Sequence, residues 1–287
     1  MRLFWLVTLA MSAFAGNSVL NRVGVAQFGM DPLSFAVIRV AAGAAMLVVL
    51  VRLNKQTLPL RGIRRWAGAG SLALYMLGFS WAYLSLGAGL GALILFGVVQ
   101  LVMFGWAAVH AEAGPRAGWV GALVSFAGLI LLLSPGADAE VSFAGAIAMA
   151  LAGVGWGAYS LLGRREVQPL AATAANFVLC LPLVLLALVA ADTGSITAAG
   201  VGLAALAGAV TSGLGYALWY HVLPQVPATL AAVAQLSVPV LAVIAGGILL
   251  AEPVTKRTLV SALLVLGGIG LSILARARQR RIGSKGS

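Results

Sequence analysis

The chain has 287 residues, of which 62% are hydrophobic and only 9% are charged. Soluble domains carry about 25% charged residues, so this composition excludes a soluble globular protein. The net charge of +11 resides in loops and near the C-terminal end, a placement that indicates a lipid bilayer rather than nucleic acid as the partner. The sequence contains no zinc, P-loop or dinucleotide motif and a single cysteine, so we expect no cofactor, no metal and no disulfide.

The first apolar stretch allows two interpretations. Arg2, the apolar run Leu3–Ala10 and the small residues Ser12–Ala15 are typical of a secretory signal that is removed. The alternative is a retained membrane helix with Asn17 along it. The internal repeat described below favours the retained helix, because cleavage would leave one half of the chain incomplete.

Runs of about 20 apolar residues, the length that crosses a hydrocarbon core of about 30 Å, follow one another along the chain. Short breaks rich in Gly, Pro or charge separate them. We therefore predict an all-α integral membrane protein with ten transmembrane helices, over residues 4–26, 32–51, 66–86, 90–110, 116–134, 142–163, 169–190, 197–221, 227–250 and 257–276.

The two halves of the chain resemble each other. Ala111-Glu112 matches Ala251-Glu252 and Gly128 matches Gly268, both at an offset of 140 residues. Five helices per half is an odd number, so the second half enters the membrane from the opposite side. The result is an inverted repeat, which is common in secondary transporters. The predicted units are a first repeat over 1–137, a second repeat over 138–276 and a basic cytoplasmic tail over 277–287.

Basic residues in the loops indicate the orientation. With the N-terminus in the cytoplasm, 14 Lys and Arg residues lie on the inner side and three on the outer side. We therefore predict a multi-pass protein of the bacterial inner membrane with both termini in the cytoplasm.

Several motifs carry a family resemblance. In AVAQLSVPVLAVIAGGILLAEP and the later SALLVLGGIGL, Pro239 lies within the ninth predicted helix, Glu252 at its end and Gly267-Gly268 in the tenth. Together with Asp31-Pro32 and Arg39 in the second helix, they resemble the ten-helix, EamA-like exporters of the drug/metabolite transporter superfamily. Two positions depart from the family pattern: many members have glycine at Ser261, and Val102-Met103 stands where a proline would mirror Pro239. The aromatic content of helices 3, 6 and 8 is most similar to the YddG-type exporters of aromatic amino acids.

Aromatic residues recur at helical spacing in two of these helices. Tyr75, Phe79 and Tyr83 lie four residues apart on one face of 66–86, and Tyr216 and Tyr220 repeat that spacing in 197–221. The third and eighth helices are equivalent in an inverted repeat, so both faces are expected at one central cavity, where rings stack and attract an ammonium group. The alternative is that these aromatic residues lie in the belt at the membrane–water interface or pack between helices. The further aromatic candidates are Trp156, Tyr159 and Trp219.

Three polar residues are further candidates. Asn17 and Gln235 suit hydrogen bonds to a substrate carboxylate or amine, and helix-to-helix hydrogen bonding is the alternative. Arg39 is the only evident charge well inside a span, about 12 Å from its outer end at 1.5 Å per residue. It either lines the cavity and favours a carboxylate, or extends outward or caps carbonyl groups.

The resemblance and the aromatic faces together imply an exporter of amino acids or related small metabolites, with aromatic and bulky apolar ones favoured. It is expected to work as a monomer by alternating access. No Asp or Glu lies deep in a predicted span, so we expect facilitated diffusion without coupling through a carboxylate. No nucleophile and base converge in the spans, so we expect no enzyme. The alternatives are a multidrug or other metabolite exporter of the same fold, and a non-transporting membrane scaffold or receptor.

Overall fold

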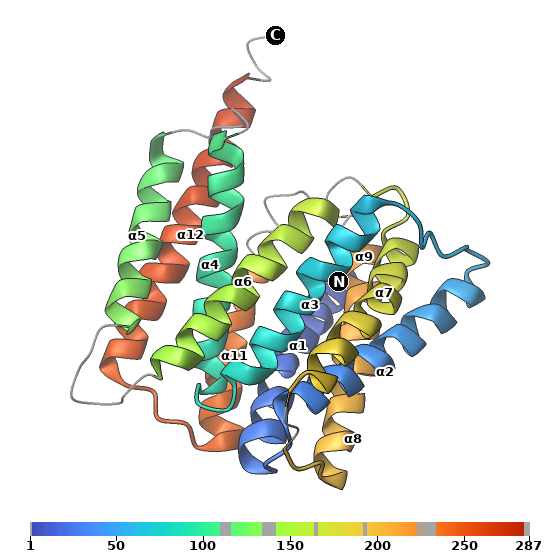
Figure 1. Cartoon of the computed structure of the whole chain (residues 1–287). Coiled ribbons are helices and arrows are strands. Elements are labelled where there is room, and N and C mark those ends of the chain that lie inside the picture. The colour runs from blue at the N-terminus through green and yellow to red at the C-terminus, as the bar shows by residue number, and fades with distance from the viewer. Residues whose placement is uncertain are drawn as a thin grey trace.

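The computed structural model describes residues 2–109, 116–133, 142–163, 166–191, 194–222, 225 and 234–283. Within these ranges the regular elements are helices, with no strand among them (Figure 1). In chain order they are α1 (Arg2–Arg22), η1 (Val23–Gln27), α2 (Pro32–Leu53), α3 (Ile63–Ala82), α4 (Ala88–Val109), α5 (Arg116–Leu133), α6 (Phe143–Gly163), α7 (Pro169–Val189), α8 (Ala198–Leu206), η2 (Ala207–Leu214), α9 (Gly215–Val222), α11 (Ser237–Leu250) and α12 (Lys256–Gly283). The elements η1 and η2 are π-helical.

The helices have the length and composition that a membrane requires. Within the described ranges, six are long and apolar enough to cross a bilayer: 2–27, 32–53, 143–163, 169–189, 198–222 and 256–275. Three shorter apolar helices cover 88–103, 119–132 and 237–250. This arrangement confirms an all-helical protein with several candidate membrane spans.

Local sequence signals explain where several helices begin. The Asp31 carboxylate accepts a hydrogen bond of 2.7 Å from the Ser34 N–H, and Pro32 occupies the first turn of α2. At α8, the Thr197 hydroxyl accepts from the Gly200 N–H in the same way. The third helix covers 63–82 rather than the predicted 66–86, because it begins directly after Gly62, whose φ of +104° suits glycine, and turns replace it after residue 82.

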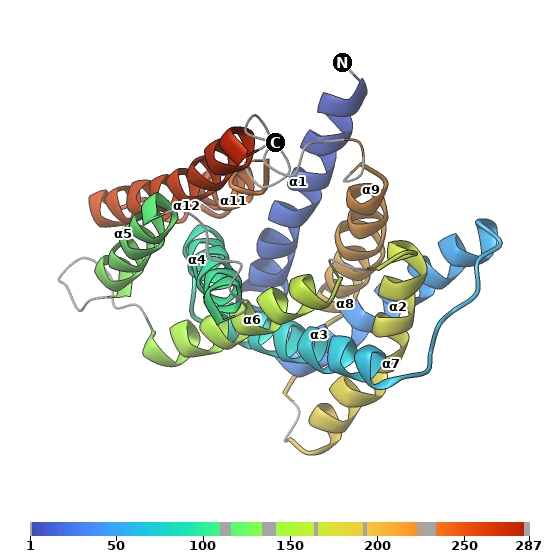
Figure 2. The same cartoon turned by 90° about the horizontal axis from the view of Figure 1, so that it is seen from above.

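The helices pack in pairs that are far apart in the sequence. Helix α5 lies along α12, α3 along α6, and α2 along α7. Helix α1 contacts α9, η2 and α11, while α4 contacts α6 and α11. Figure 2 shows α5 and α12 at one side, α2 and α7 at the other, and α1, α4, α6 and α9 between them.

Glycines allow the closest of these approaches. A Cβ atom on Gly121 would collide with the Gly268 carbonyl oxygen, and a Cβ on Gly268 would collide with that of Gly121. At the same crossing, the Ser125 hydroxyl donates to the Val265 carbonyl over 3.0 Å. Small residues of this kind let membrane helices approach until their backbones touch. The α5–α12 pair is therefore held by backbone contact.

Candidate functional site

Aromatic rings from four helices meet around Trp156 of α6. Its ring centroid lies 5.0 Å from that of Tyr75 on α3, 5.3 Å from Tyr216 on α9 and 5.6 Å from Tyr159 on its own helix. Phe14 of α1 adds an edge-to-face contact with Tyr216 at 5.5 Å. These separations are those of favourable aromatic pairs. The rings thus form one connected cluster in the middle of the bundle.

Two adjoining spaces lie against this cluster. The wider one, which we call the central cavity, has a volume of about 180 Å³ and extends to Gly163 at the end of α6 and Tyr220 near the end of α9. The narrower one, which we call the deep recess, has a volume of about 20 Å³. Both are lined by Phe14, Trp156, Tyr216 and Gln235; the deep recess adds Asn17, Ser18, Tyr75, Phe79, Leu95 and Phe96.

The predicted site residues separate into three groups. Trp156, Tyr159, Trp219, Tyr220 and Gln235 line the central cavity. Asn17, Tyr75 and Phe79 line the deep recess. Arg39 and Tyr83 line neither space and are fully buried. The structure therefore brings eight of the ten candidates together around the two spaces.

Phe14 and Met103 also line the central cavity, although neither was among the site residues predicted from the sequence. Phe14 stands three residues before Asn17 on α1, so it shares a face with a residue that was predicted. Its helical register was the available signal. Met103 lies in an apolar run and offers no such signal.

Tyr83 lies beyond the deep recess, at the end of α3. Its hydroxyl donates to the Ala88 carbonyl over 3.3 Å, and its ring meets that of Phe79 edge to face at 4.8 Å. Its own carbonyl accepts a hydrogen bond from Arg22. Tyr83 thus joins the end of α3 to the start of α4 and the end of α1.

Arg39 is buried in a polar network between α2, α3 and η2. Its Nε donates to the Ser212 hydroxyl and its Nη2 to the Tyr75 hydroxyl, both over 3.1 Å. The guanidinium carbon lies 5.4 Å from the ring centroid of Tyr75 and 5.0 Å from that of Phe79. Its Nη1 is buried and has no hydrogen-bond partner within the described part of the chain. Arg39 therefore lies directly behind two residues that line the deep recess.

Asn17 connects α1 to the same network. Its side-chain oxygen accepts from the Thr211 hydroxyl over 2.6 Å and from the Ser212 hydroxyl over 3.2 Å. Thr211 and Ser212 lie in η2, and π-helical segments of this kind are frequent at functional sites. Thr211 was not predicted from the sequence.

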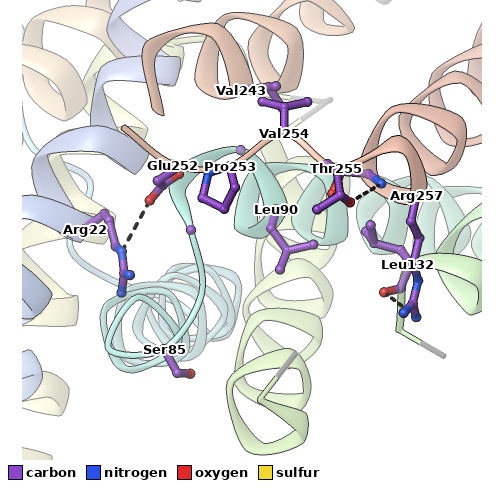
Figure 3. A pocket seen from close by; sticks show the side chains of 13 residues that line it. Arg22, Ser85, Leu90, Leu132, Val243, Glu252, Pro253, Val254, Thr255 and Arg257 are labelled. Carbon is purple, nitrogen blue, oxygen red and sulfur yellow. Dashed lines mark hydrogen bonds and ion pairs between the residues drawn. The ribbon is translucent and has the colours of Figure 1, made fainter. Parts of the chain in front are cut away.

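A third space, a pocket of about 210 Å³, lies at the opposite end of α4 (Figure 3). We call it the helix-end pocket; Arg22, Ser85, Leu90, Val243, Glu252, Thr255 and Arg257 are among the residues that line it. Both oxygens of the Glu252 carboxylate accept from the Ala88 N–H, over 3.0 and 2.8 Å, and one lies 3.4 Å from Arg22 Nε. This carboxylate is therefore already paired with an arginine and with the first turn of α4.

Metal chemistry has no evident centre in the described ranges, where no group of three or more His, Cys, Asp or Glu residues could hold an ion. His110 and Glu112 lie outside those ranges. His221 is exposed at the end of α9. The arrangement is suited to binding through rings and hydrogen bonds.

Comparisons with known proteins agree with a transport role. Residues 143–274 match the EamA-like transporter family. An uncharacterized protein of Pseudomonas aeruginosa is 44% identical over 96% of both chains. An uncharacterized transporter of Bacillus subtilis, YwfM, is 23% identical over 97% of this chain and 92% of its own length. A solved crystal structure superimposes with a TM-score of 0.66 over 97% of this chain and 98% of the other, at 17% identity, which indicates the same fold.

Proposed function

We propose that this chain, whose residues 143–274 match the EamA-like transporter family, exports small ring-bearing metabolites, aromatic amino acids foremost, through the central cavity. The observation that carries this proposal is the cluster of Phe14, Trp156, Tyr159, Tyr216 and Trp219 around that cavity. Tyr and Trp rings stack on a ligand's ring and also attract its ammonium group. Such a wall therefore favours a substrate with a ring and an amine.

The size of the central cavity supports a small substrate. Its volume of about 180 Å³ lies below the ~300–1,000 Å³ of pockets that enclose drug-sized ligands. This favours a single small metabolite over the large cations of a multidrug exporter. The helix-end pocket is a weaker candidate, because its carboxylate is already bonded to Arg22 and Ala88.

The packing pattern supports two inverted five-helix repeats, over 1–137 and 138–276. If the first helix is equivalent to the sixth and the third to the eighth, the contact of α3 with α6 corresponds to that of α1 with η2 and α9. The contact of α4 with α6 then corresponds to that of α11 with α1, and α5 and α12 pair as equivalents. Two bundles related in this way can rock about a site between them, which is the basis of alternating access.

The predicted orientation gives the cavity a direction. With both termini in the cytoplasm, α6 and α9 end on the cytoplasmic side. The central cavity reaches those ends, at Gly163 and Tyr220, so the substrate enters from the cytoplasm. The Arg22–Glu252 ion pair then lies on the outer side. We further propose that a monomer in the bacterial inner membrane carries out this transport as facilitated diffusion.

Counterflow in proteoliposomes tests the proposal with a panel of amino acids, nucleosides and cationic dyes. We expect counterflow of phenylalanine, tyrosine or tryptophan. Trp156→Ala should raise the substrate KM about 2- to 13-fold, as loss of a stacked ring worth about 0.5–1.5 kcal/mol predicts. Trp66→Ala is the matched control, since Trp66 is 46% exposed and lines neither space. Counterflow of dyes alone, or an unchanged KM for Trp156→Ala, would contradict the proposal.

A further inference from the structure

The polar network around Arg39 has a direction, because an arginine can only donate hydrogen bonds. Arg39 donates to the hydroxyl groups of Tyr75 and Ser212, which fills an acceptor position on each oxygen. Each hydroxyl keeps one hydrogen of its own to donate. Ser212 donates that hydrogen to the Asn17 side-chain oxygen. Because Arg39 only donates, each neighbour in turn donates its own hydrogen onward, toward the deep recess. Two such routes start at Arg39: one runs through Ser212 to Asn17, and the other runs to Tyr75.

The first route ends at the amide of Asn17, which lines the deep recess. The Thr211 backbone carbonyl can only accept, and it lies 3.4 Å from Asn17 Nδ2, so the amide nitrogen faces that carbonyl. The amide oxygen then accepts from the Ser212 hydroxyl, and it shares the single hydrogen of the Thr211 hydroxyl with the Ala207 carbonyl. One N–H of Nδ2 is used by the carbonyl, and the second has no acceptor among the described residues.

The second route ends at the hydroxyl of Tyr75, which also lines the deep recess. This hydroxyl accepts from Arg39, and its own hydrogen has no acceptor within the described ranges. The adjacent guanidinium makes it a stronger donor, because hydrogen-bond chains polarise one another in a region of low dielectric constant. Both routes therefore present hydrogen, and not lone pairs, to the deep recess.

We propose that the deep recess binds the carboxylate group of the substrate, with Asn17 and Tyr75 as donors and the charge of Arg39 behind them. The ion pairs of the described ranges leave Arg39 without a carboxylate, and its buried Nη1 has no partner. Its guanidinium lies within 5.4 Å of the rings of both Tyr75 and Phe79, so its field acts on the recess with little screening. A carboxylate at this position supplies the missing negative charge. The inference rests on the proposed function and adds the substrate class, a ring-bearing acid.

A binding assay separates this inference from the transport proposal. The shift in melting temperature of the detergent-purified protein is measured with phenylalanine, with 3-phenylpropionate, which lacks the amine, and with phenethylamine, which lacks the carboxylate. A ligand that binds only the folded protein raises the melting temperature according to its affinity. We expect 3-phenylpropionate to bind at least tenfold more tightly than phenethylamine.

Tyr75→Phe removes one donor and keeps the ring. It should weaken binding of the acid about tenfold or more, as expected for a hydrogen bond to a charged group, and leave binding of the amine within twofold. Tyr159→Phe is the matched control, because Tyr159 lines the central cavity outside the deep recess, and it should affect acid and amine equally. Arg39→Lys should keep the preference for the acid, and Arg39→Gln should abolish it; if neither variant folds, the Tyr75→Phe result decides.

Each outcome bears on a different statement. Equal binding of acid and amine, or an equal loss of both in Tyr75→Phe, would overturn the inference and leave ring transport standing. Binding of the ring-free 4-methylpentanoate that weakens in Tyr75→Phe, without binding of any ring-bearing compound, would refute the proposed substrate and support the carboxylate site. Failure of every acid to bind would overturn the inference.

Discussion

Substituting Glu252 by Gln should loosen the end of the bundle that lies away from the central cavity. The Glu252 carboxylate joins three helix ends: it accepts from the Ala88 N–H at the start of α4, pairs with Arg22 at the end of α1, and itself follows α11. Arg22 also donates to the carbonyl groups of Tyr83 and Leu84. Opening of this end requires that these bonds break.

The size of the effect follows from the charge that is removed. The glutamine oxygen still accepts from the Ala88 N–H, so the loss is that of the ion pair and of a negative charge at the N-terminus of α4. The two side chains are only 24% and 19% exposed, which limits screening by water. An ion pair near the surface contributes about 0.2–1 kcal/mol and a charge at a helix N-terminus about 0.3–1 kcal/mol. Together they predict closure that is weaker by about 0.5–2 kcal/mol, or about 2- to 30-fold more of the open state.

Reaction of a buried cysteine with a thiol reagent in detergent measures this opening. Ser80→Cys, in a Cys180→Ala background, places the thiol at a fully buried position one turn before Tyr83. Glu252→Gln should raise its reaction rate about 2- to 30-fold, the same factor as the rise in the open state. The matched control is Glu166→Gln, which removes a carboxylate paired with Arg65 at the other end of α3 and should leave the rate unchanged. An unchanged rate in Glu252→Gln, or an equal rise in the control, would refute the reasoning.

Four further predictions address other parts of the molecule. Reporters active only in the periplasm should give signal when fused at Ala137 and none at Gly283, and the reverse would overturn the charge argument. Ala251→Gly should increase the unfolding free energy by about 0.5–1 kcal/mol and so raise the melting temperature, because Ala251 has a φ of +52°. An unchanged melting temperature would show that this conformation carries no strain. Gly268→Val should lower the melting temperature, whereas Gly267→Val, which has open space around it, should not. A pH step across substrate-loaded liposomes should drive no uphill accumulation, and accumulation would reveal a proton site.

Helix positions could be read from the sequence because membrane spans follow from composition alone. Apolar runs and polar breaks gave helices close to those described, and the Asp31-Pro32 pair marked the start of α2. The π-helical η2 could not be predicted, because one extra residue in a turn leaves no trace in an almost uniformly apolar segment. It is this segment that supplies Thr211 and Ser212 to the polar network.

The spacing of residues along the sequence could predict on which face of a helix each one lies, but not how deep in the bundle. Tyr75, Phe79 and Tyr83 share one face of α3, since they recur every four residues. Tyr75 and Phe79 line the deep recess, but Tyr83 lies one turn further along, against α4. The partner of Arg39 was equally beyond sequence reasoning, because Ser212 is 173 residues away along the chain.

The shared face of α3 connects the deep recess to the helix-end pocket. Tyr75 meets Phe79 at 5.1 Å between ring centroids, and Phe79 meets Tyr83 at 4.8 Å. Tyr83 in turn bonds to the Ala88 carbonyl, and the Ala88 N–H bonds to Glu252. A ligand that displaces the Tyr75 ring therefore acts on the same row of side chains that closes the far end. A substrate bound at Asn17 and Tyr75 can bias that closure only if its affinity differs between the open and the closed state. The row from Tyr75 to Glu252 is where such a difference would arise.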